Sequence, residues 1–196
     1  MITFRLCGIK IGLHFSFFAA VCLLLAMREN SWGIWCLTAA LLHECGHLAA
    51  FFLIGAPPRE LHFEYSGIRL VPQKNLLSRR QELWTVTGGA AVNLGIGTLL
   101  CLCGLVFHGG FHLALGLFNL LPLPGLDGGE LLALLTERIL TPYTCQTILR
   151  VTAIAVAVPL SGWAVYLALT RQNLTLLLTV CYFLLLSLFG EQENPL

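Results

Sequence analysis

Residues 41–52 read LLHECGHLAAFF, a run in which two histidines and a glutamate interrupt apolar and small side chains. Ionisable side chains are costly in lipid, so three of them within five positions indicate a function. Residues four apart on a helix share a face, so the imidazoles of His43 and His47 can bind one metal ion. Glu44 stands beside the first of them, where a carboxylate can act as a base toward water.

Taken alone, the His-Glu-x-x-His (HExxH) pattern of residues 43–47 is moderate support for a metal site. About one chain in a hundred of this composition would carry it by chance. The alternative is a pair of helical histidines that satisfy each other or a neighbouring group. The apolar surroundings favour the metal interpretation, because packing does not explain three ionisable groups there.

The composition describes a membrane protein. Of 196 residues, 57% are apolar and 11% are charged, whereas soluble domains carry about a quarter charged residues. The net charge of +1 argues against a nucleic-acid partner, which would need a basic patch. Most of the eight cysteines lie in apolar runs, where cysteine behaves as a small hydrophobe. We therefore expect no structural disulfides, with a disulfide framework as the less favoured alternative.

We expect one all-α domain over residues 1–196, with a short strand or hairpin between its second and third helices and no PDZ or CBS domain. A span needs about 20 apolar residues, and the candidates lie at 12–27, 32–54, 83–107, 111–135, 149–170 and 173–189. The first run resembles a signal peptide but lacks a convincing cleavage site, so we treat it as a retained span. Nine of the eleven Lys and Arg residues fall on one side of this layout, which predicts that both termini are cytoplasmic.

The segment LHFEYSGIRLV (61–71) alternates apolar and polar side chains until Gly67 interrupts it. Alternation with a period of two predicts a strand or a small hairpin. Two uses remain open with equal weight: an amphipathic flap on the membrane surface, or an edge that pairs with an extended peptide.

Asp127 is the single aspartate of the chain and lies in NLLPLPGLDGG (119–129). Pro122 and Pro124 are expected to break the helix there, because proline lacks a donor and clashes with the preceding turn. A zinc ion that keeps one position open for water needs a third protein ligand, and Asp127 is our candidate. By helix rise it lies at a depth similar to the histidines, roughly 16–22 Å from the outer face. The alternative is a proline kink whose aspartate pairs with Arg138.

Gly89, Asn93 and Gly97 follow one another at steps of four and share a helix face. The glycines suit close helix packing in lipid. For Asn93 we favour a role beside the metal, either binding the substrate backbone or orienting a ligand. His108 and His112 flank an expected outer turn and are interpreted as solvated loop residues.

These three stretches, in this order, resemble the site-2 protease family of intramembrane zinc metalloproteases. The family's HExxH appears as His43, Glu44 and His47, and its Gly-Pro-x-x-Asn pattern as Gly89 to Asn93, with Ala90 in place of proline. Its Asn-x-x-Pro…Leu-Asp-Gly signature appears as Asn119, Pro122, Leu126, Asp127 and Gly128. The likeness covers approximately residues 10–135, and the six-span layout resembles a small branch that includes sporulation proteases acting on a pro-sigma factor.

The resemblance implies a zinc metalloendopeptidase with one Zn²⁺ held by His43, His47 and Asp127. Glu44 would be the catalytic base and Asn93 a substrate-binding residue. The partners would be the lipid bilayer and a single-pass or membrane-associated protein, for example a sigma or anti-sigma factor, at the bacterial cell membrane. The substrate and the regulator are not inherited from the resemblance. Two other functions stay open, a zinc-binding membrane transporter and a catalytically silent homologue that retains client proteins.

Overall fold

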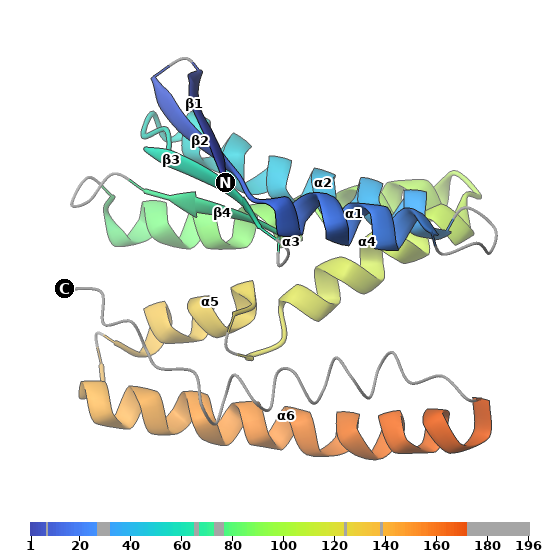
Figure 1. Cartoon of the computed structure of the whole chain (residues 1–196). Coiled ribbons are helices and arrows are strands. Elements are labelled where there is room, and N and C mark those ends of the chain that lie inside the picture. The colour runs from blue at the N-terminus through green and yellow to red at the C-terminus, as the bar shows by residue number, and fades with distance from the viewer. Residues whose placement is uncertain are drawn as a thin grey trace. The chain divides into compact units, whose positions relative to one another are not determined.

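The computed structural model describes residues 1–6, 8–26, 32–64, 67–72, 77–123, 125–137 and 139–171. The chain divides into two compact units, Met1–Asn119 and Leu120–Leu196. The first unit contains β1 (Ile2–Leu6), β2 (Ile9–Leu13), α1 (Phe15–Ala26), α2 (Trp32–Leu53), β3 (Glu60–Glu64), β4 (Gly67–Val71), α3 (Arg79–Leu102) and α4 (Val106–Asn119) (Figure 1). The described part of the second unit contains α5 (Asp127–Thr136) and α6 (Pro142–Arg171). The expected single domain over the whole chain stays a prediction.

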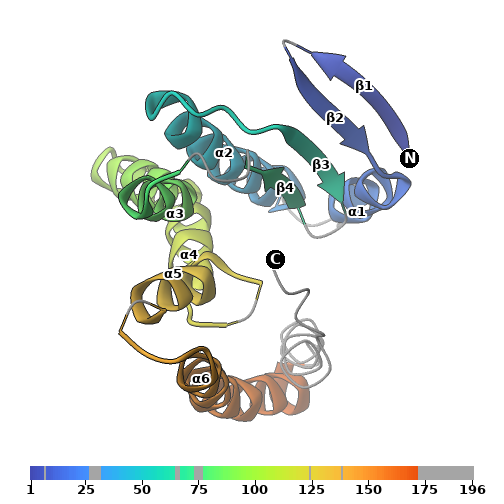
Figure 2. The same ribbon diagram turned by 90° about the vertical axis from the view of Figure 1, so that its left-hand side faces the viewer.

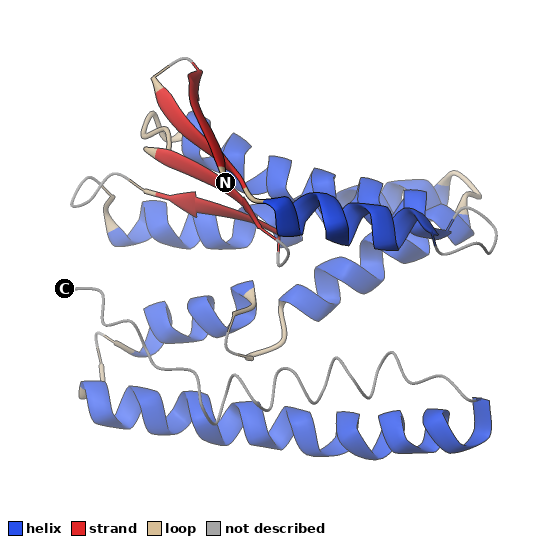
Figure 3. Cartoon of the chain, viewed as in Figure 1, coloured by secondary structure: helices blue, strands red, loops and turns tan. Residues whose placement is uncertain are grey.

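The four strands form one sheet in the order β1-β2-β3-β4 (Figure 3). The outer pairs are antiparallel, while β2 and β3 run parallel with Lys10 opposite Glu60. A parallel pair needs a long crossover, and here α1 and α2 provide it between β2 and β3. The hairpin predicted at 61–71 is thus confirmed as β3 and β4.

The expectation of strands only between the second and third helices was too narrow. β1 and β2 also form an antiparallel pair, which completes the four-stranded sheet (Figure 2). Its sequence, ITFRL followed by IKIGL, carries the same period-two alternation that identified β3. No structure was predicted for residues 2–11, and residues 12–27 were predicted to form a membrane span.

Three helices among the described residues are long and apolar enough to cross a membrane, at Trp32–Leu53, Arg79–Leu102 and Tyr143–Thr170. They coincide with three of the six expected spans. The expected first span is a helix of 12 residues, shorter than the roughly 20 that a span needs. The expected span at 111–135 is interrupted between α4 and α5, and the one at 173–189 lies outside the described residues.

The helices of the first unit pack backbone against backbone. A Cβ placed on Gly46 of α2 would lie 2.5 Å from the carbonyl oxygen of Gly88 on α3. A Cβ on Gly109 of α4 would lie 2.6 Å from the carbonyl oxygen of Gly97 on α3. Small residues between helices in lipid allow the backbones to approach this closely. The contact confirms the packing role expected for Gly97. It also brings side chains of α2, α3 and α4 within hydrogen-bonding distance of one another.

A glycine follows the C-terminus of α2 and another follows that of α3. The N–H groups of Gly55 and Ala56 donate to carbonyls of α2, and those of Gly104 and Leu105 donate to carbonyls of α3. Both glycines have positive φ, 70° and 83°, as the left-handed residue of a Schellman cap requires. The described cysteines at 22, 36, 45, 101, 103 and 145 are all free, as expected, and the other two lie outside the described residues.

Candidate metal centre

The histidines of the HExxH pattern meet on one face of α2. Both rings are buried, and the two Nε2 atoms lie 3.1 Å apart. Two zinc–nitrogen bonds of about 2.0–2.1 Å at a tetrahedral angle would place the nitrogens about 3.3 Å apart. The spacing therefore fits a shared ion, and it also suits a ring-to-ring hydrogen bond in its absence.

The far side of the His47 ring is held by α3. Its Nδ1–H donates to the carbonyl oxygen of Thr85 over 2.7 Å. A neutral imidazole carries one ring proton, so this bond leaves Nε2 with a lone pair. Metal-ligating histidines typically donate their other ring N–H to a carbonyl or carboxylate in this way. Thr85 was not predicted from the sequence, because a backbone carbonyl leaves no pattern in the residue types.

Asn93 lies directly behind His43. Its Nδ2 donates to Nδ1 of His43 over 3.4 Å, and its side chain is fully buried. Asn93 therefore lies next to one of the two candidate metal-binding histidines. Of the two roles considered for Asn93, this contact favours orienting a ligand.

The position of His112 corrects the sequence interpretation. It was taken for a solvated loop residue beside an outer turn, but it lies inside α4 with 4% of its surface exposed. Its Nδ1 donates to Oδ1 of Asn93 over 3.1 Å. The close packing of α3 on α4 makes this contact possible, and the sequence alone does not reveal it.

Gly89 lies close to the Nε2 atoms of His43 and His47. A Cβ built on it would lie 2.8 Å from Nε2 of His43 and would overlap Nε2 of His47. A side chain at this position would therefore crowd both Nε2 atoms, and glycine avoids this. The sequence had assigned this glycine to helix packing alone.

Glu44 follows His43 on α2 and is half-buried. Successive helix residues are turned by about 100°, so Glu44 projects from a face adjoining that of the histidines. A carboxylate beside a metal-binding pair can exchange protons with water at the same centre.

Asp127 belongs to the second unit, where it is the first residue of α5. The predicted interruption is confirmed, since no helix covers the described residues between Asn119 and Asp127. Gly125 has φ of 82°, and a Cβ on Gly128 would overlap the carbonyl oxygen of Leu120. The chain thus folds back tightly and places the carboxylate at a helix N-terminus, where negative charge is favoured.

The first unit supplies two imidazoles, from His43 and His47, and the second supplies a carboxylate, from Asp127; these are donors that could hold a metal ion. Nitrogen and oxygen donors of these kinds suit zinc, and three protein ligands leave a fourth position for water or substrate. The fit on the first unit is supported by the Nε2 spacing and by the room that Gly89 provides.

The described residues combine apolar helices long enough to cross a membrane with a buried histidine pair on one of them. Among solved structures, the chain is similar to the site-2 protease from Methanocaldococcus jannaschii, with a TM-score of 0.65 and 21% sequence identity. The match covers 93% of this chain and 91% of that one, so the two share their fold over nearly their whole length. No family model matches the chain, and no curated protein does.

Proposed function

We propose that this chain is an intramembrane zinc metalloprotease that hydrolyses a peptide bond of a membrane protein. The observation that carries the proposal is the pair of Nε2 atoms 3.1 Å apart on α2. It occurs on a fold shared with a site-2 protease. Apolar helices long enough to span a membrane support a location of this chemistry in lipid.

One zinc ion per chain would be held by His43, His47 and Asp127, the donor group that can bind a metal. When bound, zinc polarises a carbonyl and lowers the pKa of water. Glu44 is then the residue that accepts the proton of the attacking water and delivers it to the leaving nitrogen. Its neighbouring position on the same helix turn supports this role.

The substrate class we propose is a single-pass or membrane-associated protein, with a sigma or anti-sigma factor as one option. A helical segment hides its carbonyls in hydrogen bonds, so it must become extended before it can be cut. β4 is the last strand of the sheet and packs beside α2, the helix that carries the histidines. Adding a substrate strand there would present its backbone close to the metal centre.

We place the protein in the bacterial cell membrane with both termini in the cytoplasm. The three apolar helices support a membrane location. The Lys and Arg bias of the sequence supports the orientation. Labelling of single cysteines placed in 55–59 and 104–105, from each side of sealed vesicles, tests it.

The decisive variant is Glu44→Gln. It removes the proton acceptor but leaves every proposed ligand, so zinc content should match the wild type while cleavage falls by about 10²- to 10⁴-fold. The readout is the membrane proteome of cells carrying either form, in which an uncut single-pass protein should accumulate. Glu137→Gln is the matched control, because Glu137 is an exposed glutamate of the second unit. This variant should cleave the substrate as the wild type does.

Full cleavage by Glu44→Gln would show that another group is the base. A wild-type chain without zinc in a stoichiometric amount would refute the metal assignment. Zinc flux in proteoliposomes that depends on Asp127, without cleavage of any membrane protein, would favour the transporter.

A further inference from the structure

A continuous chain of hydrogen bonds joins three helices behind the histidine pair. His112 of α4 donates from Nδ1 to Oδ1 of Asn93 over 3.1 Å. Asn93 of α3 donates from Nδ2 to Nδ1 of His43 over 3.4 Å. On α2, Nε2 of His43 lies 3.1 Å from that of His47, whose Nδ1–H donates to Thr85.

Each of these four contacts pairs a donor with an acceptor if all three rings are neutral. Because Nδ1 of His43 accepts, its one proton lies on Nε2 and can be donated to Nε2 of His47. Because His47 donates from Nδ1, its Nε2 has the lone pair that receives this proton. This is the arrangement of ring protons that these contacts require when no ion is bound.

An ion held between the two rings needs the Nε2 lone pair of both. His43 must then carry its proton on Nδ1, which changes from acceptor to donor toward Asn93. Asn93 can meet this donor only with Oδ1, so its amide must turn over and direct Nδ2 at α4. His112 must in turn accept at Nδ1, which it does by carrying its proton on Nε2. Each ring keeps one proton throughout.

We propose that His112 is a positioning residue that, through Asn93, holds the His43 ring for metal binding and changes tautomer when the ion binds. The inference rests on the histidine ligands of the proposed function and not on its substrate. An imidazole nitrogen can donate in one state and accept in the other, whereas an apolar side chain does neither and lysine only donates. Asn93 is fully buried and His112 nearly so, and a buried polar group without a partner is costly.

The first test measures metal affinity of the full chain in lipid nanodiscs, by competition of Zn²⁺ or Co²⁺ with a chelating dye. His112→Phe keeps a ring but removes both hydrogen-bonding functions, so affinity should fall about 10- to 100-fold. The visible spectrum of bound Co²⁺ should also change. His112→Asn places an amide near the former Nδ1, can donate or accept, and should recover most of the affinity.

His108→Phe is the matched control. His108 lies one turn earlier on α4 and packs its ring edge-on against Trp35, with centroids 4.1 Å apart. It lies outside the hydrogen-bond chain, so its replacement by phenylalanine should leave metal affinity and the Co²⁺ spectrum unchanged. An equal loss in this variant would mean that α4 acts through packing alone and would overturn the proposal.

The second test needs no variant to fold. Nitrogen and carbon NMR shifts of labelled histidine distinguish the two tautomers in wild-type protein in bilayers. His112 should carry its proton on Nδ1 without metal and on Nε2 at saturating zinc. A proton that stays on Nδ1, or full affinity in His112→Phe, overturns this inference and leaves the proposed function standing. A wild-type chain that binds no metal overturns both.

Discussion

At the scale of single residues, Gly89 is the position where one added methyl group should affect the metal centre most. In Gly89→Ala the new Cβ would press on the His43 and His47 rings at their Nε2 atoms. Both rings would have to move away from the ion, so metal affinity should fall about 10- to 100-fold. Dye competition in nanodiscs measures the change.

Gly95→Ala is the control for that experiment, since it lies on the same helix with nothing within 4 Å of its added Cβ. It should bind metal normally and, as a glycine-to-alanine change inside a helix, stabilise α3 by about 1 kcal/mol. Wild-type affinity in Gly89→Ala would show that the rings bind an ion elsewhere.

His43 and His47 can be predicted as a pair from their spacing alone, because residues i and i+4 share a helix face. Glu44 was predicted from its place beside them. Thr85 and His112 acquire their roles only where α3 crosses α2 and α4, so their partners lie far along the chain. Asn93 was found because a lone amide in an apolar run is costly, although its partners were not.

At the scale of elements, two adjacent glycines of α4 should respond in opposite ways to alanine. In Gly109→Ala the Cβ would lie 2.6 Å from the Gly97 carbonyl oxygen, so α3 and α4 must separate. We expect a loss of about 1–3 kcal/mol in the free energy of unfolding. In Gly110→Ala the Cβ meets nothing within 4 Å, and a gain of about 0.5–1 kcal/mol is expected.

Reversible unfolding in mixed detergent micelles measures both variants on the same scale. The neighbouring position is a strict control, because helix propensity and depth are nearly identical. Equal stability of the two proteins would show that α4 does not pack on α3 through Gly109.

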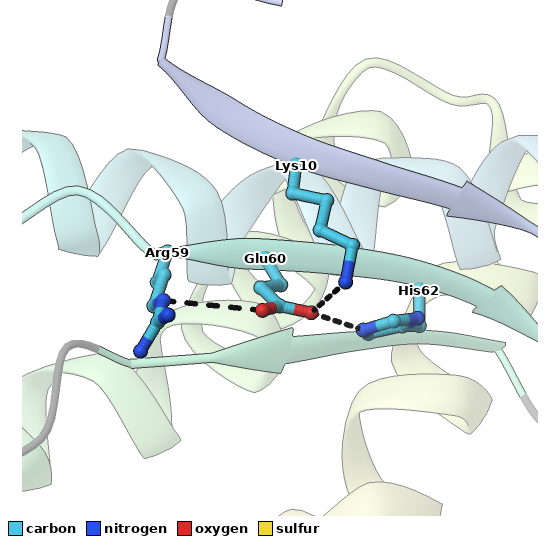
Figure 4. A network of polar contacts seen from close by, with 4 residues as sticks. All are labelled: Lys10, Arg59, Glu60 and His62. Carbon is cyan, nitrogen blue, oxygen red and sulfur yellow. Dashed lines mark hydrogen bonds and ion pairs between the residues drawn. The ribbon is translucent and has the colours of Figure 1, made fainter. Parts of the chain in front are cut away.

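The sheet should loosen in acid because of Glu60. Its carboxylate accepts hydrogen bonds from His62 and from Lys10, which pairs with it across β2 and β3, and Arg59 lies close by (Figure 4). The hydrogen bond from His62, and then that from Lys10, lower the pKa of Glu60 below its ordinary value of 4.5. When folding lowers the pKa of a carboxyl group, that group stabilises the folded state fully at pH values above its ordinary pKa. This stabilisation is lost as the pH falls through the lowered pKa of the folded state.

Amide exchange of β2 and β3, measured at falling pH and corrected for intrinsic rates, should show this loosening. In Glu60→Gln the pair should exchange faster at neutral pH and respond less to acid. Glu82→Gln, a change outside the sheet in the first turn of α3, should keep the wild-type profile. If Glu60→Gln loosens in acid as the wild type does, another group controls the sheet.

Elements were predictable where one local signal dominated. The prolines predicted the interruption before Asp127, and period-two alternation predicted β3 and β4. The same alternation in β1 and β2 was overlooked, because the apolar run that begins at residue 12 was interpreted as a membrane span. Strand pairing between β2 and β3 joins segments 50 residues apart, so composition within a window does not reveal it.

At the scale of the whole molecule, apolar content identified a membrane chain but not its number of spans. Hydropathy treats 111–135 as one segment, although α4 ends the first unit and α5 lies in the second. Helices as short as α1 also escape a rule based on length. What the proposed function adds is a reason for the two units to act together, since the ligands it assigns come from both.

If His43, His47 and Asp127 hold one ion, zinc should stabilise both units at once. Ligand at a hundred times its dissociation constant adds about 2.7 kcal/mol to the stability of a chain that binds it only when folded. Amide exchange in α2 and in α5 should therefore slow together as zinc is added to the full chain in nanodiscs, and a chelator should reverse both effects. In Asp127→Ala, zinc should leave α5 unaffected and protect α2 only weakly, while Glu137→Ala should behave as the wild type. Equal protection of α2 in Asp127→Ala and the wild type would mean that the third ligand is another residue.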